Sequence, residues 1–280
     1  MTDGYVVPAT SAPAGVRPRP PLLLVAGGVL LALVVLAGVL APLLAPYDPI
    51  SQIPAANLLP PSGSHPLGTD ELDRDVLSRV LYGIRTSLTV IAVAVPVGAV
   101  AGVTLGLFGA SNRFADVLLS RVTDVILAFP ALILAVLVTA LRGPGSVTVV
   151  IAIAIAEAPS FARLTRSEVL RLRSQPYVEA SRLAGGSSAW VLTRHILPNA
   201  AEPLLVQAAL ALSLGVFVEA GMSFVGVGVR PPQPSLGSLL SEAVYNWDAN
   251  AGYAIGPLVA IIALSLSLLA VARGVAGWRR

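Results

Sequence analysis

Long uncharged apolar runs, separated by short polar segments, dominate the pattern of this chain. A helix rises about 1.5 Å per residue, so about 20 predominantly apolar residues cross the hydrocarbon core of a bilayer. The pattern predicts an all-α integral membrane protein with six transmembrane helices. The expected helices lie within residues 22–45, 86–112, 125–141, 146–161, 203–226 and 254–272.

Composition supports a membrane protein and excludes several kinds of site. The chain is 55% hydrophobic and 12% charged, against about 25% charged residues in a soluble domain. It has no cysteine, which excludes disulfides and thiolate metal sites, and its two histidines are far apart. No metal site is therefore expected. All 18 basic residues are arginines; their distribution explains the high isoelectric point better than a nucleic-acid partner does.

The polar segments divide the chain into parts. Residues 1–20 hold Pro and Arg but no apolar run and are expected to be a disordered cytoplasmic tail. Residues 21–46 are expected to form the first transmembrane helix. Its uncharged run at 22–45 has 24 residues, which exceeds the apolar part of a signal peptide, about 7–15 residues. Next come an extracytoplasmic loop at 47–83, a five-helix core at 84–273 with a cytoplasmic loop at 163–199, and a cytoplasmic C-terminal tail at 274–280.

Two segments outside the membrane carry local structure signals. In the loop at 47–83, Thr69 or Asp70 is expected to cap an amphipathic helix that lies on the outer surface and leads into the second span. The Pro-rich segment 229–252 is expected to be either a packed outer cap or a contact surface for a substrate-delivering protein.

Arginine asymmetry predicts the orientation. With the N-terminus in the cytoplasm, thirteen arginines fall in inside segments. Five fall outside, namely Arg74, Arg79, Arg85, Arg142 and Arg230. Because cytoplasmic segments are enriched in Arg and Lys, both termini are expected to be cytoplasmic.

The inner loop carries a helix-turn-helix pattern. A basic helix continues the fourth span to about residue 174 and is interrupted at Pro176. A short helix over 177–184 is broken by Gly185 and the glycine after it, and Ser187 is placed to cap a second short helix through His195. Such a structure on the basic face of a membrane protein suggests a docking surface for a soluble partner.

The residues of this loop resemble a known signature. Glu179, Ala180 and Ser181 are followed by Gly185 and, after nine residues, by His195-Ile196-Leu197-Pro198. This resembles the EAA signature of ATP-binding-cassette (ABC) importer permeases. Four further segments, 65–88, 121–130, 163–170 and 224–237, are similar to the dipeptide/oligopeptide/nickel branch of DppC/OppC type. The resemblance covers about residues 20–240.

Several positions depart from that pattern. Asp73 stands where the family usually has Gly, Ser181 replaces the second Ala of the signature, and Leu236 stands where Trp is common. The acidic, Pro-containing tail often seen in the family has no counterpart, which leaves a tail contact open.

The resemblance implies a fold, an activity and partners. The implied fold is the type I ABC importer (MetI-like) permease fold in a bacterial inner membrane. The implied function is half of a translocation pathway for di- or oligopeptides, formed with a homologous DppB/OppB-type permease. Two ABC ATPase subunits would bind ATP and Mg, and an extracytoplasmic binding protein would deliver substrate. The residues implied in ATPase coupling are Glu179, Ala180, Ser181, Gly185, His195, Ile196, Leu197 and Pro198.

No catalytic constellation is visible in the sequence. There is no Gly-rich phosphate loop ending in Gly-Lys-Ser/Thr, and the chain has no lysine. The chain is therefore expected to be neither an enzyme nor a holder of a cofactor, and ATP is expected to be hydrolysed by another subunit.

Two prolines and two glutamates interrupt the apolar runs. Pro96 and Pro130 are expected to kink their helices. Glu157 and Glu219 are ionisable groups inside spans, and such groups normally face a bundle interior or a water-filled cavity. They are candidates for the translocation path, with a hydrogen bond between helices as the simpler explanation.

Other functions remain open at this stage. A proton-coupled secondary transporter would use Glu157 and Glu219, but it predicts internal repeats that the sequence does not show. A purely structural membrane scaffold is a third possibility. Within the importers, a nickel chelate, glutathione or an oligosaccharide could replace peptides as the solute.

Overall fold

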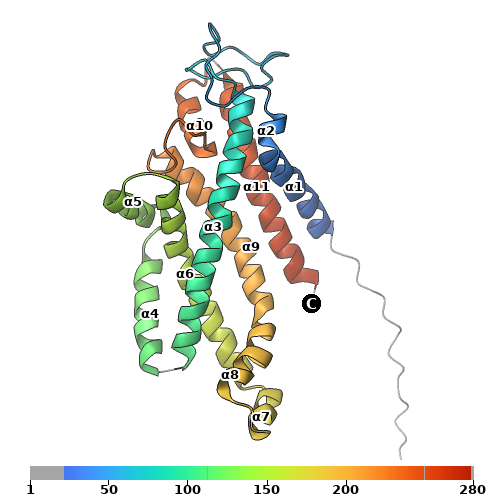
Figure 1. Ribbon diagram of the computed structural model, residues 1–280, viewed down its shortest axis with the longest axis vertical. Helices are drawn as coiled ribbons and strands as arrows, with labels where there is room; N and C mark the ends of the chain where they lie inside the picture. Colours follow the sequence, from blue (N-terminus) through green and yellow to red (C-terminus); the bar gives the residue numbers. More distant parts are fainter. Residues whose placement is uncertain (1–21, 112, 249, 279–280) are drawn as a thin grey trace, which may run out of the picture.

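The computed structural model describes residues 22–111, 113–248 and 250–278, and these are almost entirely helical (Figure 1). The expected tail at 1–20 lies outside the described residues. The expected tail at 274–280 is instead helical as far as Trp278. The long helices run side by side along one axis.

The helices, in chain order, are α1 (Leu22–Val39), α2 (Ala41–Leu44), α3 (Val76–Ser111), α4 (Arg113–Ala128), α5 (Ala131–Arg142), α6 (Ser146–Arg173), α7 (Pro176–Leu183), α8 (Ser188–Val191), the π-helix η1 (Leu192–Ile196), α9 (Leu197–Phe224), α10 (Leu236–Tyr245) and α11 (Ala251–Trp278).

Five helices are long and apolar enough to cross a membrane, and a sixth span is obtained if α4 and α5 are counted together. The span expected over 125–141 is therefore not one straight helix, because α4 and α5 meet at 95°. Pro130 explains the break, since it has no N–H and disfavours a helical conformation at Phe129. Pro96 lies inside α3, which runs to Ser111, and the kink expected there stays a prediction.

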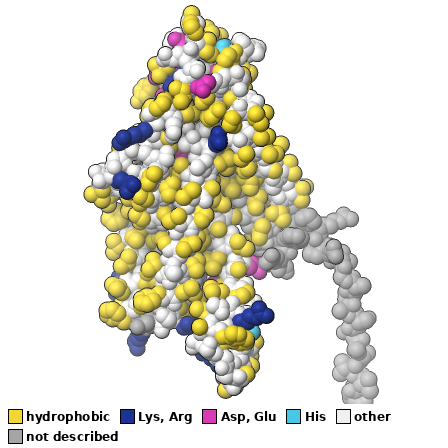
Figure 2. All heavy atoms as spheres, in the orientation of Figure 1, with side chains coloured by type: hydrophobic (Ala, Val, Ile, Leu, Met, Phe, Trp, Pro, Cys, Tyr) yellow, Lys and Arg dark blue, Asp and Glu magenta, His cyan; other side chains and the backbone are white. Residues whose placement is uncertain are grey.

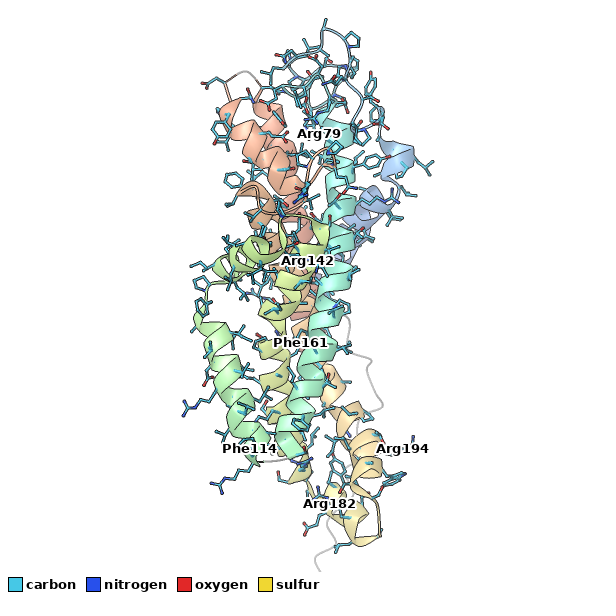
Figure 3. The ribbon with its side chains drawn as sticks, turned by 60° about the vertical axis from the view of Figure 1, so that its left-hand side comes forward. Arg79, Phe114, Arg142, Phe161, Arg182 and Arg194 are labelled. Carbon is cyan, nitrogen blue, oxygen red and sulfur yellow. The ribbon has the colours of Figure 1, made fainter. Side chains whose placement is uncertain are left out.

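Small residues let α3 and α6 pack closely against each other. Gly98, Gly102 and Gly106 follow one face of α3 and lie directly against the backbone of α6. A Cβ on Gly102 would come within 2.6 Å of the Cβ of Phe161, which is buried midway along the bundle (Figure 3). Small residues at four-residue spacing allow this close approach, as in many transmembrane helix pairs.

The two ends of the bundle differ in structure. One end, called the hairpin end, carries α7, α8 and η1, and the opposite end, called the loop end, carries residues 45–75 and α10 (Figure 1). The first described residues of α1 and the last of α11 both point toward the hairpin end (Figure 1). The described ends of these two helices therefore lie on the same side of the bundle.

The helix expected to start at Thr69 or Asp70 starts later. It begins at Val76 and is continuous with the second span, so it is not a separate surface helix. Asp75 caps it, since its Oδ2 accepts the N–H of Ser78 at 2.8 Å. Asp73 has φ +61°, a left-handed conformation that favours Gly and that Asp tolerates. The tight turn before the helix therefore explains why Gly is common at this position in the family that the sequence resembles.

A buried polar network holds the loop end together. Asp70 accepts the N–H groups of Leu72 and Arg74, at 2.8 and 2.9 Å, and pairs with the guanidinium groups of Arg74 and Arg79. Arg79 also reaches Glu242 of α10 at 2.9 Å. The network joins the loop, α3 and α10. The sequence did not predict this network.

The segment 229–252 has one face packed on the bundle and one exposed face. One face of α10 packs inward through Leu236, Leu239 and Ala243, which are fully buried. On the other face, Tyr245 is 87% exposed, and the following Trp247 is 53% exposed. The segment is thus a packed cap with an exposed aromatic surface.

Candidate functional site: the hairpin between α6 and α9

The candidate site is the hairpin formed by residues 176–198. Pro176 occupies the first turn of α7, where its missing N–H costs nothing. Gly185 has φ +89°, and the N–H of Gly186 donates to the carbonyl of Ser181 at 3.0 Å, closing the helix end. Ser187 Oγ accepts the N–H of Trp190 at 3.3 Å and caps α8. The predicted helix, glycine break and capped second helix are confirmed.

The second arm of the hairpin contains a feature that the sequence did not reveal. Leu192–Ile196 form a π-helix, and the N–H of Leu197 donates to Leu192 O, five residues back. Pro198 has no N–H and cannot make the usual bond to the fourth residue before it. Widening the turn accommodates the missing donor, and α9 then starts at Leu197 rather than near residue 203, where the sequence placed the fifth span.

The hairpin is anchored to the long helices by an apolar cluster. Val178 of α7, Val191 of α8 and Ile196 of η1 are at most 1% exposed. They pack with residues of α3, α6 and α9, namely Ala110, Val169, Leu172 and Ala200. Because this cluster is fully buried and close-packed, the hairpin and the ends of these helices are expected to move as one body.

His195 fastens the two arms of the hairpin to each other. Its Nε2 shares a hydrogen bond of 3.0 Å with Ser181 Oγ of α7. Its ring lies edge-on to Trp190, with centroids 4.9 Å apart, and is 6.1 Å from Tyr177. The structure therefore brings Ser181 and His195 of the sequence signature together. The two aromatic partners were not among the predicted residues.

The other residues of the signature divide between the core and the surface. Ile196 is buried, Leu197 is half-buried, and Pro198 sits exposed in the first turn of α9. Glu179, Ala180 and Gly185 are exposed, and Glu179 makes no ion pair or side-chain hydrogen bond with the described part of the chain. The signature thus supplies both the anchoring and the free face of the hairpin.

The free face combines apolar and basic side chains. Leu183 is 84% exposed and Trp190 49% exposed. A groove of about 450 Å³ lies between the arms, lined by Ser181, Ala184, Gly185, Gly186, Ser187 and Trp190. Arg182 and Arg194 lie at this tip (Figure 3), where basic and apolar groups are seen together on the surface (Figure 2). An exposed face of this kind is typical of an interaction surface.

The two intramembrane glutamates lie elsewhere and differ in their surroundings. Glu219 is fully buried; its Oε2 accepts Ser87 Oγ of α3 at 2.5 Å, and its Oε1 accepts Ser223 Oγ at 3.1 Å. Glu157 is 9% exposed and has no hydrogen-bond partner among the described residues. Glu219 therefore links α9 to α3, whereas Glu157 is buried without such a bond.

Comparison with known proteins shows the family of this chain. Residues 102–279 match the family described as binding-protein-dependent transport system inner membrane component. Residues 23–61 match the N-terminal transmembrane domain of oligopeptide transport permease C. The chain belongs to the binding-protein-dependent ABC importer permeases. This confirms the expected family and that the chain is a multi-pass inner-membrane component.

Relatives in this family carry peptide-transport names. The di/tripeptide transport system permease protein DppC of Pseudomonas aeruginosa is 42% identical over 225 residues, which cover 78% of this chain and 74% of that protein. The dipeptide permease DppC of Haemophilus influenzae is 37% identical, with coverage of 78% and 76%. The glutathione permease GsiD of Pectobacterium atrosepticum is 38% identical, with coverage of 88% and 81%.

A solved structure confirms the predicted fold class. An inward-facing structure of the MetNI methionine ABC transporter aligns with a TM-score of 0.60 at 22% identity. The alignment covers 72% of this chain and 97% of that chain. The protein therefore has the MetI-like permease fold.

Proposed function

We propose that this permease forms half of the translocation pathway of an ATP-driven importer of short peptides. The hairpin between α6 and α9 receives an ATPase subunit. The observation that carries the proposal is an exposed apolar and basic face on a hairpin that is itself fixed to three membrane helices by buried residues. The peptide substrate is supported by the names of the relatives. One relative is named as a glutathione permease, and glutathione is itself a short peptide carrying a thiol.

The proposed mechanism is mechanical. ATP binding closes two ATPase subunits, which bind ATP and Mg, and the docked hairpins follow them. Because Val178, Val191 and Ile196 lock the hairpin to the ends of α3, α6 and α9, its displacement is passed to these helices. Rigid-body motion of this kind switches the side to which a pathway opens. A homologous permease supplies the other half of the pathway, and an extracytoplasmic binding protein supplies the substrate.

The orientation follows from the same proposal. The hairpin end and both termini are cytoplasmic, and the loop end faces outward. The arginine distribution supports this, as does the shared direction of the described ends of α1 and α11 (Figure 1). The buried network around Asp70 and Arg79 then forms a rigid outer cap, and the exposed Tyr245 and Trp247 offer a surface to the binding protein.

The intramembrane glutamates take different roles in this proposal. Glu219 clamps α9 to α3 through Ser87, which matches the simpler explanation given from sequence. Glu157 lacks a partner in the described chain and is assigned to the translocation path or to contact with the second permease. Membership of an ABC importer family argues against proton-coupled transport as their purpose.

The test is a charge reversal on the free face of the hairpin. Glu179→Arg is expected to abolish ATP-driven peptide uptake by the reconstituted complex and to weaken ATPase docking, while the two permeases remain assembled. Asp124→Arg is the matched control, since Asp124 is also an exposed carboxylate but lies on α4, outside the hairpin, and its surface ion pair with Arg163 contributes little. Normal uptake by Glu179→Arg, or equal loss in both variants, contradicts the proposed role of the hairpin.

A further inference from the structure

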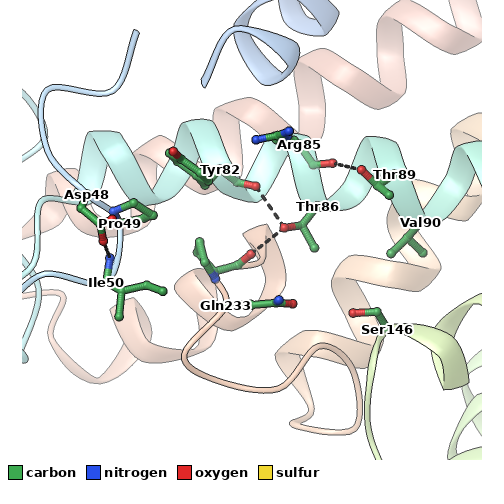
Figure 4. Close-up of a pocket in the computed structure, with 11 residues that line it drawn as sticks. Asp48, Pro49, Ile50, Tyr82, Arg85, Thr86, Thr89, Val90, Ser146 and Gln233 are labelled. Carbon is green, nitrogen blue, oxygen red and sulfur yellow. Dashed lines mark hydrogen bonds between the residues drawn. The ribbon is translucent and has the colours of Figure 1, made fainter. Parts of the chain in front are cut away.

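A pocket at the loop end carries chemistry that the hairpin mechanism does not use. Its volume is about 410 Å³, within the range of about 300–1,000 Å³ typical of small-molecule sites. Segments far apart in the sequence meet there: the loop at 48–50, α3 from 82 to 90, the start of α6, and the turn before α10. Figure 4 shows the residues of α3 along one wall, with Gln233 and Ser146 across from them.

The lining of the pocket carries one positive side chain, on α3, and one negative side chain, on the loop at 48–50, and the two are not paired with each other. Arg85 is exposed and makes no ion pair with the described residues, whereas Arg74 and Arg79 are buried and paired. Asp48 is also exposed; its Oδ1 accepts the N–H groups of Ile50 and Ser51, at 2.8 and 3.2 Å. These bonds fix the carboxylate in place but leave its charge uncompensated.

Neutral polar groups complete the pocket. Thr86 donates to the carbonyls of Tyr82 and Pro234, each at 3.0 Å, and so joins the α3 wall to the opposite turn (Figure 4). The side chains of Tyr82, Gln233 and Ser146 make no hydrogen bond with the described chain. The pocket is therefore braced by Thr86, and the polar groups of Tyr82, Gln233 and Ser146 remain free to bind a ligand between Arg85 and Asp48.

We propose that this pocket is an outer binding site for a short zwitterionic peptide on its way into the translocation path. Arg85 takes the terminal carboxylate, since a guanidinium matches a carboxylate with two parallel hydrogen bonds. Asp48 takes the terminal ammonium group, and the neutral side chains face the peptide amide. The proposal rests on peptide import as the proposed function and assigns residues of this chain to substrate recognition.

The test uses the complete complex, with the partner permease, ATPases and cognate binding protein, in vesicles. The variants are Arg85→Gln, Arg85→Lys and Asp48→Asn, with Arg142→Gln as the matched control because Arg142 is another exposed arginine and does not line the pocket. Labelled dipeptide uptake at saturating liganded binding protein is measured together with the affinity of binding-protein docking.

Arg85→Gln is expected to lower uptake roughly tenfold, the usual effect of losing a charge-assisted hydrogen bond. Asp48→Asn is expected to lower it as well, Arg85→Lys less, and the control not at all, with docking affinity unchanged throughout. Weaker, salt-sensitive docking by Arg85→Gln would assign Arg85 to the binding protein and overturn the proposal. A loss of uptake seen only in vesicles with anionic lipid would assign Arg85 to a lipid phosphate and would also overturn the proposal.

A second measurement tests the site even if the Arg85 and Asp48 variants fail to fold. A photo-crosslinking residue at Thr89, which lines the pocket, is expected to capture labelled dipeptide in the otherwise native complex, whereas the same residue at the exposed Val244 is not. No capture at Thr89 during active uptake refutes the site alone. A native complex that takes up no peptide refutes the proposed function instead.

Discussion

Ser181, which departs from the family signature, gives a quantitative test of how the hairpin is held together. Its hydroxyl shares a 3.0 Å hydrogen bond with His195, across the two arms. Such a bond contributes about 0.5–1.5 kcal/mol net. If the bond contributes about 1 kcal/mol, removing it raises the population of the open hairpin about fivefold. Ser181→Ala restores the usual Ala of the signature and is expected to cause this increase.

The assay is hydrogen exchange of peptides covering residues 177–186, which include the Gly186 N–H bonded to Ser181 O. His195→Phe keeps a ring beside Trp190 but cannot form the bond, so it is expected to raise exchange by a similar factor. Because both changes remove the same interaction, the double variant should add little.

A local control separates this effect from a general loss of stability. Thr193→Ala removes a hydroxyl that bonds only within its own arm, to Ala189 O and Trp190 O. Exchange over 177–186 is expected to stay unchanged in this variant. Unaltered exchange in Ser181→Ala, or fully additive effects of the two substitutions across the arms, would refute the assigned role of His195.

Further predictions concern the helices and the outer cap. Gly102→Val is expected to block packing of α3 on α6 and to abolish the folded peak in size-exclusion chromatography. Gly28→Val, with nothing within 4 Å of the new Cβ, is expected to elute normally. Equal elution profiles of the two variants would contradict the close packing of α3 on α6. Arg79→Met removes one of the two guanidinium groups that pair with the buried Asp70 carboxylate. It is expected to destabilise the protein by about 3–5 kcal/mol and so to lower the thermal midpoint. Adding Asp70→Asn should recover part of that loss, and no recovery would count against the network. Glu219→Gln keeps a hydrogen-bonding group and is expected to retain most uptake, whereas Glu219→Leu lowers the thermal midpoint; a large uptake defect in a stable Glu219→Gln would favour a path role.

Local signals explain why the hairpin was predictable. Pro176, Gly185, Ser187 and Pro198 each act on their own backbone through a missing N–H, a left-handed turn or a side-chain cap. Such effects need no knowledge of the rest of the fold. The apolar runs likewise predict the spans, because the bilayer requires them wherever the helices pack.

Features that depend on tertiary contacts were not predictable in the same way. Pro130 predicts a kink, but the 95° turn of α5 depends on what it packs against. The late start of α3 at Val76 depends on Asp75 capping the helix while Asp70 is used by the buried arginines. The pocket at the loop end joins segments from residue 48 to residue 234, a separation that periodicity cannot bridge.

The contact between the hairpin and an ATPase subunit is the central claim, and the absence of cysteine from the chain makes it directly measurable. Leu183→Cys places one thiol on the free face, and Leu141→Cys serves as control, since both leucines are 84% exposed. A short crosslinker with one thiol-reactive and one amine-reactive end is expected to link the thiol of Leu183→Cys, but not that of Leu141→Cys, to an amine of an ATPase subunit in the assembled importer. Absence of that link, together with labelling of Leu183→Cys by a membrane-impermeant reagent applied outside intact cells, would contradict the account.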